Sequence, residues 1–156
     1  VIWNAGTSFP ASKATGDRYW RTDLGMEFYW DGTRWVTTTL YTMSFGNANA
    51  VTPHSASGGQ KESHPSLTLD MWAINFWCAT YVTTTNDGSK YWTITLDGLA
   101  VTLSTISNAA SSVVVESSAV NAVIAAGSWL TVSITKVSTP GTLYAPTMLS
   151  YRLIAT

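Results

Sequence analysis

Charged side chains are scarce in this chain of 156 residues. Asp, Glu, Lys and Arg make up only 11% of it, against about a quarter in an ordinary soluble domain, and the formal net charge is −1. A nearly neutral chain has no broad electrostatic attraction to nucleic acid or to an anionic membrane surface. We therefore expect no nucleic-acid partner. We also expect a surface that is covered by neutral polar groups or hidden against other subunits.

The chain also has very little cysteine and no long apolar run. Cys78 is the single cysteine, which excludes an intrachain disulfide scaffold. Its apolar neighbours indicate a buried side chain rather than a nucleophile. No apolar run approaches the roughly 20 residues of a membrane span, so we expect no membrane insertion. The first residues lack the basic and apolar regions of a signal peptide.

Motifs that carry chemistry are absent as well. His54 and His64 stand ten residues apart, which matches no known metal-ligand spacing. Asp70 and Glu116 could in principle pair as the acid and base of a glycosidase, but nothing in the sequence places them together. There is no G-x-S-x-G motif and no glycine-rich phosphate loop. We therefore predict no catalytic residues, no metal site and no cofactor, and a protein that is not an enzyme.

Aromatic and β-branched residues are abundant instead, and short segments of them are separated by turn signals. The chain holds eight Trp and seven Tyr, and such residues favour strands. Asp-Gly recurs between apolar segments and predicts turns at these positions: Asp31, Gly32, Asp87, Gly88, Asp97 and Gly98. The pattern predicts an all-β fold, an antiparallel β-sandwich of jelly-roll type. An N-terminal arm and meander would occupy residues 1–38, and the sandwich residues 39–156.

The segment 16–38 is the most informative part of the chain. We predict a three-stranded antiparallel meander with strands at 17–22, 26–30 and 33–38. A two-residue type I′ turn at Asp31-Gly32 would place Trp30 opposite Thr33 and Phe28 opposite Trp35. One face of the sheet would then carry Phe28, Trp30 and Trp35. On the other face, Arg34 could lie on the ring of Tyr29.

Further along the chain the pattern is less regular. We expect residues 37–45 to continue as a strand and residues 46–66 to form a surface loop. In 67–85 the apolar phase changes, which indicates a bulge or corner near Ala73. Segment 119–126 fits a strand or a short helix, with the strand favoured. Further strands are predicted at these ranges: 90–96, 99–103, 129–137 and 145–155.

The meander also carries a resemblance. The residues Gly16-Asp-Arg-Tyr-Trp-Arg-Thr-Asp-Leu24 and Tyr29-Trp-Asp-Gly-Thr-Arg-Trp35 resemble a small hairpin module of tailed bacteriophages. The module is found in their tail-fibre, head-fibre and other virion structural proteins. The segments 127–136 and 149–154 are similar to the closing strands of phage jelly-roll domains. The resemblance implies a non-enzymatic component of the virion, in a family whose members are commonly trimeric.

Five side chains of the meander are candidates for contact with a partner or a glycan: Trp20, Tyr29, Trp30, Arg34 and Trp35. A small sheet cannot bury enough surface by itself, so its aromatic rings must pack on the sandwich, on a neighbouring subunit or on a ligand. We expect a symmetric homo-oligomer, with three subunits favoured by the resemblance, and contacts to other virion proteins. A host surface glycan is a possible further ligand, because sugar rings stack on exposed aromatic rings. The alternatives are a carbohydrate-binding module and a glycan-active enzyme.

Overall fold

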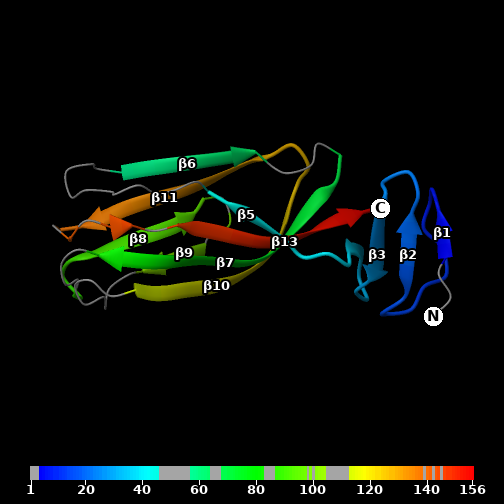
Figure 1. The fold of residues 1–156 in the computed structure, drawn as a ribbon, viewed down its shortest axis with the longest axis horizontal. Helices are drawn as coiled ribbons and strands as arrows, with labels where there is room; N and C mark the ends of the chain where they lie inside the picture. The colour runs from blue at the N-terminus through cyan, green and yellow to red at the C-terminus, as the bar shows by residue number, and fades with distance from the viewer. Residues whose placement is uncertain are drawn as a thin grey trace.

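The computed structural model describes residues 4–45, 57–63, 68–82, 87–97, 99, 101–104, 113–138, 140–141, 143–144 and 146–156. These residues form thirteen strands and no helix, which confirms the all-β prediction. The molecule is elongated, with a two-sheet sandwich at one end and a small sheet at the other, where both termini lie (Figure 1).

The strands form a nine-stranded and a four-stranded sheet. The larger sheet contains β1 (Asn4–Gly6), β2 (Arg18–Arg21), β3 (Met26–Trp30), β4 (Trp35–Thr37), β5 (Tyr41–Ser44), β7 (Asp70–Val82), β10 (Val113–Ile124), β12 (Leu143–Tyr144) and β13 (Thr147–Ala155). The four-stranded sheet contains β6 (Ser57–Ser63), β8 (Tyr91–Leu96), β9 (Val101–Ser104) and β11 (Trp129–Val137).

The sandwich consists of two layers of four main strands each, and the two-residue strand β12 pairs with β7 in the first layer. One layer has the order β5-β13-β7-β10, and the other has the order β6-β11-β8-β9. Alternate side chains of each layer meet in a common core, as period-2 strands require. Strand β11 illustrates the pattern, because Leu130, Val132 and Ile134 are buried while the residues between them face outward. Cys78 is also buried, as the sequence predicted.

Strand β13 belongs to both ends of the molecule. Its first residues pair with β7 and β5 in the sandwich, and its last two, Ile154 and Ala155, pair with Val36 and Trp35 of β4. The small sheet consists of β1, β2, β3 and β4. It continues the larger sandwich sheet through the pairing of β4 with β13 (Figure 1).

The predicted irregularity near Ala73 is a bulge at Ile74. Between β7 and β13 the register shifts, because Asn75 faces Ser150 and Ala73 faces Tyr151, which leaves Ile74 without an opposite residue. The shift changes which side chains point inward: Met71 and Ala73 are buried before the bulge, and Phe76 and Cys78 after it. Segment 119–124 belongs to β10, so the strand alternative is confirmed there.

The meander forms as predicted, but its hairpin register was wrong. Trp30 faces Trp35, and Phe28 faces Thr37. The loop residues are Gly32 and Thr33, because Asp31 precedes the turn and its carboxylate accepts hydrogen bonds from the amides of Thr33 and Arg34 at 2.7 and 2.8 Å. Since the shift is two residues, the predicted grouping of Phe28, Trp30 and Trp35 on one face still holds.

Three other predicted segments differ from the structure. Residues 37–45 do not form one strand, since β4 ends at Thr37 and β5 begins at Tyr41. The predicted loop 46–66 contains strand β6, which pairs with β11 along its whole length. The N-terminal arm contributes β1, which pairs with β2 in parallel. Neither β1 nor β6 has an apolar alternation, so periodicity gave no signal for them.

Candidate contact surfaces

Four aromatic rings form the core of the small sheet. The ring of Phe9, in the N-terminal arm, stacks on Trp35 with the centroids 4.6 Å apart and the planes at 4°. Phe9 also meets the edge of Phe28, and Tyr19 packs beside it. Trp35 is only 3% exposed, so this candidate belongs to the core and offers little surface to a partner.

A pocket of about 410 Å³ lies beside this core, between the arm, the hairpin turn and the end of β13. It brings together three of the five candidates, Trp30, Arg34 and Trp35. It also contains Lys13, whose ammonium lies 4.2 Å from the centroid of the Trp30 ring. The sequence singled out no role for Lys13, because its place beside Trp30 depends on how the arm folds back onto the hairpin.

Arg34 does not lie on Tyr29, contrary to the sequence-based expectation. Its guanidinium lies 5.0 Å from the centroid of Trp72 on β7, and its Nε is 3.4 Å from the carboxylate of Asp31. Tyr29 instead contacts Arg152, at 5.3 Å from the ring centroid. The hairpin register explains the difference, because Arg34 lies opposite Asp31 within the turn rather than opposite Tyr29 in the sheet.

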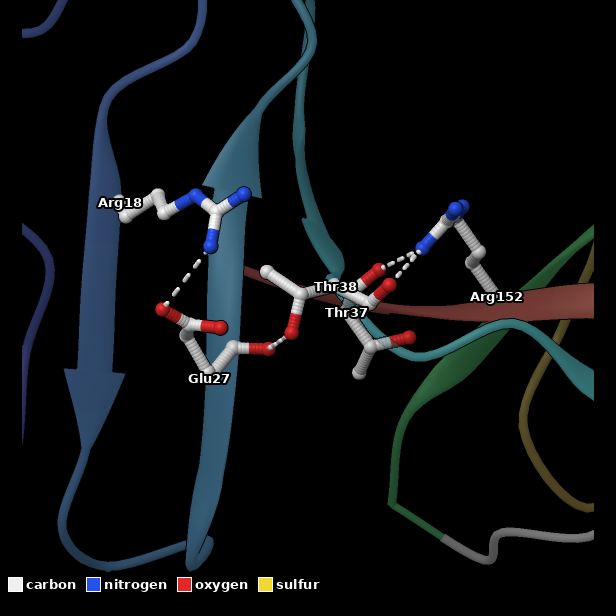
Figure 2. Close-up of polar contacts among 5 residues, drawn as sticks. All are labelled: Arg18, Glu27, Thr37, Thr38 and Arg152. Carbon is white, nitrogen blue, oxygen red and sulfur yellow. Dashed lines mark hydrogen bonds and ion pairs between the residues drawn. The ribbon is translucent and has the colours of Figure 1, made fainter.

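Arg152 links the two ends of the molecule (Figure 2). From β13 it donates hydrogen bonds to the carbonyl oxygens of Thr37, the last residue of β4, and of Thr38, which follows it. Thr38 in turn donates from its amide to the carbonyl of Glu27 on β3, at 3.0 Å. Because these groups come from the sandwich and from the meander, the contacts fix the small sheet relative to the sandwich.

Trp20 is the most exposed of the candidates that the sequence proposed. It is 38% exposed and lines a separate pocket of about 340 Å³ with Glu27, Thr38 and Tyr41. Trp129 is far more exposed, at 70%, although no motif around it predicted a functional role. Its position in the sequence could have predicted this exposure, because Trp129 begins β11 and alternates with the buried residues of that strand.

The outward face of the larger sandwich sheet carries no formal charge over three rows of side chains. Paired residues of neighbouring strands point to the same side of a sheet, so the register defines the rows. We call the following residues the neutral sheet face: Thr42, Ser44, Asn75, Trp77, Ala79, Val115, Ser117, Ala119, Met148 and Ser150. The face combines Trp, Met and Val with small side chains, and Val115 is 66% exposed.

The outward face of the second sheet has a different character, because hydroxyl groups line its central rows. These outward residues are Thr93, Thr95, Thr102, Thr131, Ser133 and Thr135, and Trp129, Tyr91 and Val137 lie on the same face toward its ends. The hydroxyls of Thr95 and Thr102 lie 3.2 Å apart, and Ser133 donates to Asp97. Hydroxyl groups remain well solvated in water, so these central rows can stay exposed without a partner.

Asp87 and Asp70 have structural partners. The Asp87 carboxylate accepts hydrogen bonds from the hydroxyl and amide of Ser89, and these bonds lower its pKa. Asp70 accepts a hydrogen bond from the Ala126 amide at 3.0 Å, which supports the loop between β10 and β11. Within the described residues no three metal-ligating side chains gather. Gly98, His54, His64 and the side chain of Glu116 lie outside the described residues.

No family model matches the sequence, and no curated protein matches it. In the part of the chain that the structure describes, no helix has the length and apolar character to cross a membrane.

Proposed function

We propose that the protein is a non-enzymatic structural component of a bacteriophage virion, a fibre, decoration or receptor-binding protein, that assembles as a symmetric oligomer. The neutral sheet face is the observation that carries the assembly. On this face Val115 is exposed, Trp77 and Met148 are partly exposed beside it, and no side chain is charged, as is typical of surfaces that pack against another subunit. Closed symmetry lets identical chains cover such a face without forming filaments.

The order of the strands supports the phage assignment. From β5 onward the sandwich strands lie in the two orders β5-β13-β7-β10 and β6-β11-β8-β9. The chain thus alternates between layers in the way that wraps a jelly roll, an architecture common in viral capsid proteins. The residues that resemble the phage hairpin module form β2, β3 and β4 with the turns between them. We favour three subunits because of that resemblance.

The mass of the assembled protein tests the proposal. We expect multi-angle light scattering at micromolar concentration to give a trimer. Val115→Glu should shift it to monomers, because the carboxylate would be buried without a partner in the interface. Thr135→Glu is the matched control, since it places the same charge on the exposed hydroxyl-covered sheet and should leave the trimer intact.

Two results would contradict the proposal. A wild-type monomer at micromolar concentration would remove the assembly argument. A trimer that survives Val115→Glu but dissociates with Thr135→Glu would move the interface to the other sheet.

The virion assignment is tested by an antibody raised against the chain, which should label the particles of the source phage and leave host cells without phage unlabelled.

A further inference from the structure

The pocket beside Trp30 differs from its neighbours in its charge. Three pockets formed by the described residues beside the small sheet can be compared. One contains Asp17 together with Arg18, and a second contains Glu27 without a cation. The pocket beside Trp30 contains Lys13 and Arg34 and no acidic side chain. It is therefore the one of the three that is suited to an anion.

The two cations are incompletely paired. Within the described residues, Lys13 has no carboxylate within ion-pair distance, and its ammonium rests on the Trp30 ring. Such a contact holds an exposed ammonium only weakly, so the group can turn toward an anionic ligand. Arg34 has one carboxylate neighbour, Asp31, and its buried Nε makes no hydrogen bond. The side chains that line the pocket thus carry more positive than negative charge.

The rest of the lining is mainly apolar and aromatic, with Thr33 and Thr156 as its neutral polar side chains. Phe9, Pro10, Ala11 and Ile154 contribute to the wall, and the half-buried ring of Trp30 stands beside Lys13. An aromatic ring beside cations suits a sugar that carries an acidic group, because the apolar C–H face packs on the ring while the anion meets the cations. The volume of about 410 Å³ falls within the usual range of small-ligand sites, roughly 300–1,000 Å³.

We propose that this pocket binds an acidic saccharide, with Lys13 as the principal contact to its anionic group, Arg34 as a second contact and Trp30 as the stacking surface. The inference deepens the proposed function, since such sugars would be the attachment site on a host surface. The binding itself does not depend on assembly. The anionic group can be a carboxylate or a phosphate, and the pocket chemistry is the same for both.

The test uses the full chain and three soluble probes: a glucuronic-acid oligosaccharide, its neutral glucose counterpart and a glucose phosphate. We expect titration calorimetry or ligand-observed NMR to detect an acidic sugar and not the neutral one. Whether the uronate or the phosphate binds identifies the anionic group. Affinity should fall as salt is raised, because an exposed ion pair is screened.

Variants then locate the site. Lys13→Met keeps the aliphatic stem, and we expect it to weaken binding at least tenfold. Lys90→Met is the matched control, because Lys90 is an exposed lysine beside the Asp87 turn, and it should bind as the wild type does. Thr33→Glu, on the exposed rim, should also weaken binding through charge repulsion, whereas Thr102→Glu on the hydroxyl-covered sheet should not.

The outcomes separate this inference from the proposed assembly. Three results would overturn it: neither acidic probe binds, the neutral sugar binds as tightly as the acidic one, or Lys13→Met binds as tightly as the wild type. A monomer that binds the acidic probe through Lys13 keeps the pocket and contradicts the oligomer. A trimer that binds neither acidic probe supports the oligomer and contradicts the saccharide pocket. Unchanged thermal unfolding of the variants shows that a loss of binding is not a loss of folding.

Discussion

Replacing Arg152 by Met should weaken the connection between the meander and the sandwich. The guanidinium donates to the carbonyls of Thr37 and Thr38 and lies over the ring of Tyr29 (Figure 2). A charged hydrogen bond contributes about 1.5–3 kcal/mol, and the contact with the ring about 0.5–1 kcal/mol. The variant should therefore lose roughly 2–4 kcal/mol of unfolding free energy, or roughly 4–16 °C in Tm for a domain of this size.

Arg18→Met is the matched control for this prediction. It removes the same charge, but the Arg18 side chain is 53% exposed and lies 3.7 Å from Glu27. An exposed pair of this kind contributes at most about 1 kcal/mol. Urea denaturation followed by tryptophan fluorescence measures both variants. Equal losses of stability in Arg152→Met and Arg18→Met would refute the role that we assign to Arg152.

Three further predictions concern the hairpin turn, the aromatic core of the small sheet and the Asp87 turn. Gly32→Val should cost about 1–2 kcal/mol, because Gly32 has a φ of 104° and an added Cβ would lie 3.2 Å from the Thr15 hydroxyl; an unchanged Tm would contradict this. Trp35→Ala should cost roughly 3–5 kcal/mol while the exposed Trp129→Ala changes stability by no more than about 0.5 kcal/mol, as measured in urea. The folded-state pKa of Asp87 is lowered, so its stabilising effect is present above a pH of about 4 and lost as the pH falls below it. Asp87→Asn should flatten the fall in Tm over that acidic range, and an identical pH profile would contradict the assignment.

Local patterns in the sequence predicted the parts of the fold that depend on local contacts. The meander, the bulge near Ala73 and the alternating strand β11 all follow from periodicity and turn residues. The hairpin register failed because the position of Asp-Gly within the turn depends on the Asp31 carboxylate, which binds the two following amides from before the turn. Strand β6 was missed because it contains Gly, Lys, Gln and Glu and forms through pairing with β11 rather than through its own propensity.

The pocket was only partly predictable for a related reason. Trp30 and Arg34 stand out in the sequence because they surround a turn signal, and both line the pocket. Lys13 lies in an arm without periodicity, and Ile154 reaches the pocket through the pairing of β13 with β4. That pairing joins residues more than a hundred positions apart, so no window of sequence contains a signal for it.

Strand β13 also connects the acidic-saccharide pocket with the neutral sheet face. Met148 and Ser150 lie on that face, while Ile154 and Ala155 line the pocket, so one strand fixes their separation. A trimer built through the face would hold three pockets at a constant spacing, and simultaneous engagement can raise apparent affinity by about 10²–10⁴. The wild type should therefore bind a surface coated with the acidic saccharide at least tenfold more tightly than the Val115→Glu monomer does. Both proteins should bind the soluble oligosaccharide with equal affinity in calorimetry. Equal binding of both to the coated surface would mean that the pockets cannot engage together, and that assembly has no part in attachment.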